Sequence, residues 1–177
     1  MAAILRERQI MATNIDSLNH SFKGTVDFDG GNVMALAYGA DDVMTATVPA
    51  TGNLKGLAMA YNPSVRYIKV GNKTVAGGDI SVDERDYTNL AGIVGDCFIP
   101  QPFDEIGLTA EAIDGVTAPT VGKFLEAANG KKTLTIAESQ TADVLSLKVV
   151  RIDQEQFPKA GIGYETVPLY ICQVVAN

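Results

Sequence analysis

The sequence predicts a mainly β protein: an antiparallel sandwich or barrel-like domain with at most short helices and an N-terminal arm. Three observations predict this class. Asn129-Gly130 stands between two alternating segments, which is the strongest short-range signal for a hairpin. Val144–Ile152 alternates apolar and polar residues with the period of two of a half-buried strand. Short apolar runs recur at intervals of about ten residues between Gly, Asn and Pro, as in an all-β sandwich or barrel.

Residues 1–21 differ from the rest of the chain and are expected to form the arm. Ala2–Met11 has apolar residues on one side of a short helix, but a helix of this length is marginal alone and must pack on something. Asn14–Phe22 is polar without a clear period, and such a segment frays unless the core or a partner holds it. Whether translation starts at Met1 or at Met11 is left open by the sequence, and a start at Met11 would make the first ten residues dispensable.

Residues 22–177 are expected to form the β-rich domain, with a division into two subdomains near 96–120 left open. The strand candidates of its first half are Phe22–Phe28, Val33–Tyr38, Val43–Val48, Leu54–Tyr61 and Val65–Val70. Asp29-Gly30-Gly31 supplies the positive φ angles that a hairpin between the first two candidates needs. Gly39–Asp42 is the next turn, and Val75–Asp96 is looser and more acidic.

The C-terminal third should form a closing antiparallel sheet around the hairpin at Asn129-Gly130. Lys123–Glu126 and Thr133–Ile136 are expected as the strands on either side of this turn. The alternative is a short helix over Val121–Ala128, capped by Thr120 and stopped by Asn129-Gly130. Val167–Val175 is apolar on nearly both faces, which is expected of a strand between two neighbours. Thr109–Asp114 is the best internal helix, with Thr109 as its N-cap.

The charge of the chain argues against nucleic acid as a partner. The chain has 14 Lys and Arg against 21 Asp and Glu, which gives a net charge of -7, and the positive residues are scattered along the sequence. Such a surface would repel a phosphate backbone. The first eight residues are too polar for a signal-peptide core and no apolar run reaches membrane-spanning length, so we expect a soluble protein made in the cytoplasm. Cys97 and Cys172 are expected to be buried free thiols, with a disulfide between them left open.

Candidate catalytic residues are few. The single histidine, His20, lies in the polar arm, where no rigid scaffold positions it against a nucleophile, so we expect it to be solvated or at an interface. Asp104, Glu105 and Glu111 are carboxylates that acid–base chemistry needs, but nothing in the sequence makes them converge. We therefore expect no enzyme, no catalytic residues and no cofactor.

Metal and phosphate motifs are also incomplete. The carboxylates of one acidic loop are Asp79, Asp83, Glu84 and Asp86. Their spacing does not match an EF-hand loop, so a solvated loop is expected rather than a metal site. Gly115–Lys123 approaches the phosphate-loop pattern, but the glycine spacing is wrong and Phe124 stands where a hydroxyl is needed. Gly161-Ile162-Gly163 lacks the third glycine of a dinucleotide motif and is expected to be a turn.

Three segments rich in small and β-branched residues carry a resemblance: Ala35–Ala40, Val121–Leu134 and Val167–Val175. The chain resembles virion proteins of tailed bacteriophages, particularly head decoration or cement proteins, most strongly over its C-terminal third. The resemblance implies a protein that binds the outer surface of the capsid, clamps neighbouring subunits of the major capsid protein, and performs no chemistry. It implies a virion location after synthesis in the host cytoplasm. Many such proteins are trimers, and others bind as monomers or dimers.

The arm supplies the expected partner contacts. Arg6 and Arg8 suit acidic patches on a capsid, and Ile4, Leu5 and Ile10 offer apolar anchors. The alternative is that this segment packs on its own domain. Two other functions stay open: a phage tail-tube or other tail structural protein, which would form rings or tubes alone, and a small-ligand or calcium-binding β module with a concave pocket.

Overall fold

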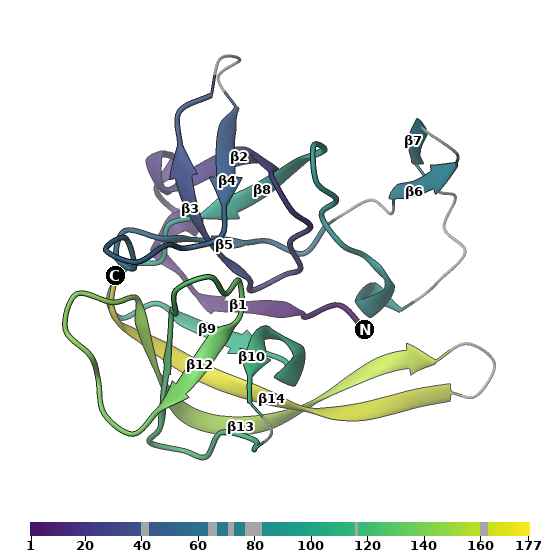
Figure 1. The fold of residues 1–177 in the computed structure, drawn as a ribbon. Helices are drawn as coiled ribbons and strands as arrows, with labels where there is room; N and C mark the ends of the chain where they lie inside the picture. The colour runs from purple at the N-terminus through teal and green to yellow at the C-terminus, as the bar shows by residue number, and fades with distance from the viewer. Residues whose placement is uncertain (40–42, 64–66, 71–72, 77–82, 116, 160–162) are drawn as a thin grey trace.

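The computed structural model of the chain describes residues 1–39, 43–63, 67–70, 73–76, 83–115, 117–159 and 163–177. These residues form a closed five-stranded barrel and a seven-stranded sheet, with strand β1 of the sheet running between the barrel and the other strands (Figure 1). Helical structure in the described residues consists of short 3-10 turns at Met11–Thr13, Asp16–Leu18, Glu84–Asp86 and Ala110–Ala112. The predicted mainly β class with short helices is confirmed.

The barrel is built from the first half of the chain. Its strands, in spatial order, are β2 (Asn19–Gly24), β4 (Met44–Thr47), β3 (Val33–Ala37), β5 (Ala58–Ala60) and β8 (Val94–Phe98). β2 runs parallel to β4 and antiparallel to β8, and the β2–β8 pairing closes the barrel. Between β5 and β8 the chain adds a separate hairpin, β6 (Tyr67–Val70) with β7 (Lys73–Ala76).

Three of the barrel strands, β3, β5 and β8, bring buried apolar residues to both faces because each face meets a core. The residues inside the barrel are Phe22, Phe28, Met34, Ala46, Ala58, Ala60 and Cys97. Their neighbours along three strands, Val33, Met59 and Phe98, belong to a second core that the barrel shares with the seven-stranded sheet. Because successive side chains of a strand point to opposite faces, three short strands serve both cores.

The seven-stranded sheet comes mainly from the second half of the chain. Its strands, in spatial order, are β1 (Leu5–Gln9), β9 (Glu105–Leu108), β14 (Gly163–Ala176), β13 (Ser146–Lys159), β11 (Phe124–Glu126), β12 (Leu134–Ala137) and β10 (Ile113–Asp114). The predicted hairpin at Asn129-Gly130 joins β11 to β12, and Gly130 has φ 71°. The predicted position of Val167–Val175 between two strands is confirmed, because β14 pairs with both β13 and β9.

β13 and β14 are longer than the alternation of the sequence predicts. They stay paired from Ser146 opposite Ala176 to Lys159 opposite Gly163, and their outer halves extend past the rest of the sheet (Figure 1). We call this outer part, Gln154–Lys159 with Gly163–Val167, the ribbon. Because the ribbon consists largely of charged and polar residues, hydrophobic alternation does not predict it.

Three local predictions need correction, the third of them only in its length and helix type. Ala2–Met11 is not a helix but contains strand β1. A helix of this length is marginally stable by itself, whereas a strand here gains backbone hydrogen bonds to β9. Asp29–Gly31 does not join a hairpin, because both edges of β2 are taken by β4 and β8. The helix expected over Thr109–Asp114 is a 3-10 turn followed by β10, and the turn expected at Gly39–Asp42 lies largely outside the described residues.

The expectation of a separate arm over residues 1–21 also needs correction. β1 belongs to the large sheet, and β2 of the barrel begins at Asn19, so this segment links the two lobes. The lobes otherwise divide between Phe98 and Glu105, inside the range where a subdomain division was left open. Among the described residues, no helix is long and apolar enough to cross a membrane.

Candidate protein-binding surface

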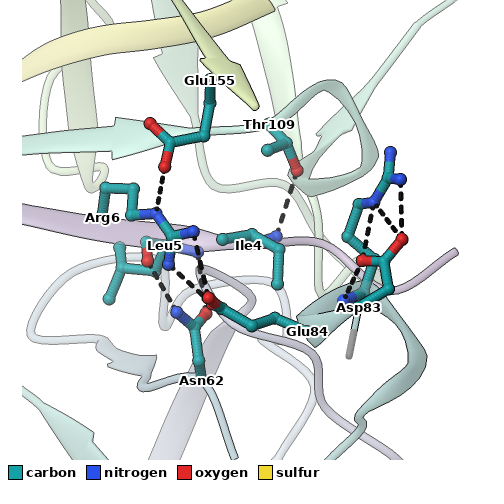
Figure 2. Close-up of polar contacts among 9 residues, drawn as sticks. Ile4, Leu5, Arg6, Asn62, Asp83, Glu84, Thr109 and Glu155 are labelled. Atoms are coloured by element: carbon teal, nitrogen blue, oxygen red, sulfur yellow. Dashed lines mark hydrogen bonds and ion pairs between the residues drawn. The ribbon is translucent and has the colours of Figure 1, made fainter. Parts of the chain in front are cut away.

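The apolar residues expected to anchor a partner lie inside the chain's own body. Ile4 is fully buried, and Leu5 and Ile10 are only 2% and 5% exposed. Two bonds fix the backbone of Ile4. Its N–H donates to Oγ1 of Thr109 at 3.1 Å (Figure 2). Its carbonyl accepts from the N–H of Thr109. Of the two arrangements left open by the sequence, packing on its own domain is the one adopted.

The two arginines of this segment bind carboxylates of the same chain. Arg6 donates to Glu84 at 2.7 Å and to Glu155 at 3.1 Å (Figure 2). The guanidinium group of Arg8 lies 3.9 Å from the carboxylate of Asp153. Both side chains remain partly exposed, so these pairs lie at the surface and stabilise the fold only weakly. Arg6 thus pairs with Glu155 of the ribbon, and Arg8 lies beside Asp153, the residue before the ribbon begins.

A buried arginine holds the ribbon against the body. The Arg85 side chain, 1% exposed, donates to Asp83 at 2.7 Å and to Glu165 at 2.8 Å. Its hydrogen bonds hold the pKa of Asp83 below the usual range, although burial opposes this shift. The guanidinium groups of Arg85 and Arg6 both lie over the ring of Phe157, at 4.7 and 5.4 Å from its centroid. This cluster joins β1, the 83–86 turn and the ribbon.

The acidic loop that was expected to be solvated is partly engaged in ion pairs. Asp83 and Glu84 bind the arginines just described, whereas Asp79 lies outside the described residues. No group of three or more His, Cys, Asp or Glu in the described part of the chain is arranged to hold a metal ion. The Asp104 carboxylate is also committed, because it accepts backbone N–H bonds from Met11 and Gln101, each at 2.8 Å.

The segment that approaches a phosphate-loop pattern is an irregular connection before β11. Lys123 at its end forms an ion pair with Glu138, and the N–H of Gly122 donates to the carbonyl of Val149. No helix follows this segment, whose residue 116 lies outside the described residues, so the helix N-terminus that cradles a phosphate is lacking.

Phe103 is the most conspicuous surface residue because its backbone is strained and its ring is exposed. It has φ 79°, which is rare for a residue other than glycine, and it is 80% exposed. It occupies the third position of a four-residue turn, Gln101–Asp104, closed by a 3.0 Å bond from the Asp104 N–H to the Gln101 carbonyl. Glycine is usual at such a position.

The surroundings of Phe103 keep the strain in place. The Phe103 N–H donates to the carbonyl of Val174 at 2.9 Å, and the Val174 N–H donates to the carbonyl of Asp104 at 2.8 Å. Together with the buried Asp104 carboxylate, these bonds fix the turn on the end of β14. Met11, whose N–H binds that carboxylate, is a second partly exposed apolar residue beside the turn. The result is a rigidly presented aromatic ring.

A cleft of about 630 Å³ runs beside β1, which we call the β1 cleft. It is lined by Leu5, Glu7, Asn19, His20, Ser21, Tyr61, Asn62, Pro63, Asn89, Val94, Gly95, Asp96 and Cys97. β1 forms one wall and the barrel strands β2 and β8 form another. His20, expected to be solvated or at an interface, is half-buried in this cleft on β2.

The electrostatic character of the β1 cleft is negative. Desolvation is the main cause that raises the pKa of Tyr61 to about 12, and the charges of Glu7, Asp104 and Asp96 add to it. The Tyr61 hydroxyl donates to Oδ1 of Asn19 at 2.9 Å. Cys97 is a free thiol behind the barrel wall, and burial raises its pKa to about 12, so it is not a nucleophile at neutral pH.

Comparisons of the chain with protein-family models, with curated proteins and with solved structures found no match. The sequence did not predict the roles of three residues: the exposed Phe103, Asn62 beside the edge of β1, and the buried Phe157 that attaches the ribbon. Only Phe103 carried a signal, because Pro102 before it predicts a turn with a large aromatic where glycine is common.

Proposed function

We propose that this chain is a structural virion protein that binds the outer surface of a tailed-phage capsid and stabilises contacts between subunits of the major capsid protein. The resemblance of three sequence segments supports the virion setting. The two β lobes with a shared core supply the stiffness such a role needs. Trimer formation is an expectation that rests on the resemblance alone.

One observation carries the binding role: Phe103 is exposed in a conformation that costs the fold free energy. A left-handed backbone costs a residue with a side chain about 1–2 kcal/mol. Strain of this kind clusters at functional sites, where the surrounding structure holds it. Rigid exposed aromatic side chains are frequent anchors of protein interfaces. Phe103 therefore inserts into a pocket of the capsid surface, and the partner is bound without a detachable arm.

The test uses capsid shells assembled without this protein, to which purified chain is added. Phe103→Gly removes the ring and relieves the strain, so the variant should fold at least as stably as the natural chain yet co-sediment with shells at least tenfold more weakly. Shells that carry the natural chain should rupture at a higher temperature than bare shells or shells incubated with the variant. Tyr38→Gly, which removes a comparably exposed aromatic from the barrel lobe, is the control and should bind normally.

Two results would contradict the proposal. If Phe103→Gly and the natural chain protected shells equally, Phe103 would not be the anchor. If the natural chain neither bound nor protected shells, the capsid role itself would fail, and rings or tubes of purified protein in electron micrographs would then favour a tail component.

A further inference from the structure

The β1 cleft contains the free edge of the large sheet. β1 is the terminal strand of the spatial order, and among the described residues β9 is the one strand with which it pairs. The backbone N–H and carbonyl of Ile4 bond to Thr109, on the β9 side of β1. Because these groups alternate in direction along a strand, those of Leu5 and Glu7 point away from β9. Both Leu5 and Glu7 line the cleft. The hydrogen-bonding edge of β1 therefore faces into a cavity.

Asn62 already takes the place of one residue of a neighbouring strand. Its Oδ1 accepts from the Leu5 N–H at 2.9 Å, and its Nδ2 donates to the Leu5 carbonyl at 2.7 Å (Figure 2). Gly30 makes room for it, since a Cβ at Gly30 would lie 1.8 Å from the Asn62 oxygen. In the described part of the chain, Glu7 has no comparable backbone partner on this side.

The other lining residues suit an extended, positively charged occupant. Glu7 and Asp96 are exposed carboxylates, and none of the described lining residues is Lys or Arg. The volume of about 630 Å³ is within the range of sites that enclose a ligand. Strand addition at a sheet edge obtains affinity from backbone hydrogen bonds and specificity from neighbouring side-chain pockets.

We propose that the β1 cleft binds an extended polypeptide segment of another protein that carries a Lys or Arg, by adding that segment to the edge of β1. The backbone of the segment continues from Asn62 along Glu7. Its basic side chain lies between the carboxylates of Glu7 and Asp96. This site is separate from the Phe103 turn and does not depend on the capsid role.

The test pans a displayed library of random dodecapeptides on the full-length chain. Enriched peptides should alternate β-branched residues with Lys or Arg. A synthetic copy of the best peptide should bind Asp96→Lys and Glu7→Lys at least tenfold more weakly. Glu138→Lys, the same charge change at an exposed site outside the cleft, should leave binding unchanged, and so should Phe103→Gly.

Two further probes separate strand addition from simple charge attraction. N-methylation of alternate backbone amides of the peptide should abolish binding in one of the two possible phases and spare the other. The double variant Glu7→Lys/Asp96→Lys should gain affinity for a peptide whose Lys residues are replaced by Glu, which a misfolded variant would not do. Absence of enriched peptides, equal binding to Asp96→Lys, or indifference to both methylation patterns would overturn the proposal. Self-association through this cleft, removed by Asp96→Lys, would identify a second copy as the occupant and would also overturn it.

Discussion

At the scale of single residues, a side chain replaces a strand. Asn62 satisfies both backbone groups of Leu5 because a side-chain amide carries N–H donors and a carbonyl acceptor side by side, as a peptide group does. Gly30 allows this close approach and has no positive φ, so its small size rather than its flexibility is needed. The edge of β1 is thereby anchored at Leu5 and open at Glu7.

Asn62→Asp should destabilise the fold by about 1–3 kcal/mol, because the carboxylate keeps the acceptor but faces the Leu5 carbonyl without a donor. Urea denaturation at pH 7 measures the change. Asn129→Asp is the matched control. The Oδ1 of Asn129 accepts from the Thr51 N–H, and among the described residues its Nδ2 donates to no acceptor, so the free energy of unfolding should change little. Equal losses in both variants would show that Asn62 does not act as a strand residue.

At the scale of elements, the ribbon depends on one buried side chain. Phe157 is 1% exposed, whereas Gln154 and Gln156, which precede it on β13, are exposed. Its contacts with Arg6 and Arg85 connect the ribbon to the body. An isolated two-stranded ribbon is marginally stable in water, so this attachment should govern its opening.

Phe157→Leu should therefore loosen the ribbon more than the sheet. Backbone amides of the ribbon should exchange hydrogen at least tenfold faster, while those of Leu169–Val174, in the buried part of β14, should keep their protection. Hydrogen exchange read by mass spectrometry measures both segments in one experiment. Tyr164→Leu changes an exposed aromatic of the same ribbon and should have little effect. A uniform rise across both segments would instead indicate that the whole fold opens together.

At the scale of the whole molecule, two cores each contain a free thiol. Cys97 lies inside the barrel and Cys172 in the core shared by barrel and sheet. Burial raises the pKa of both thiols to about 12. Above about pH 9 the unfolded chain loses thiol protons that the folded chain retains, so the unfolded state gains stability as the pH rises.

The free energy of unfolding should thus fall between about pH 9 and 12, by at most about 1.4 kcal/mol per pH unit for each thiol. Urea denaturation at pH 8, 9, 10 and 10.5 follows this loss. The double variant Cys97→Ala/Cys172→Ala starts from a lower stability, because it leaves small cavities, but its dependence on pH should be flatter. Parallel curves for the two proteins would show that the thiols are not the source.

The sequence by itself determined the β class, the hairpin at Asn129-Gly130 and the central place of Val167–Val175, because turn chemistry and side-chain period act over a few residues. It did not determine that Ala2–Met11 contributes a strand, since a short segment takes the form that pairing with β9 and the common core favour. The surface was decided by tertiary structure alone. Backbone hydrogen bonds with Val174 fix the turn that exposes Phe103. Glu7 and Asp96 line the same cleft, and local sequence patterns cannot predict this because it depends on long-range packing.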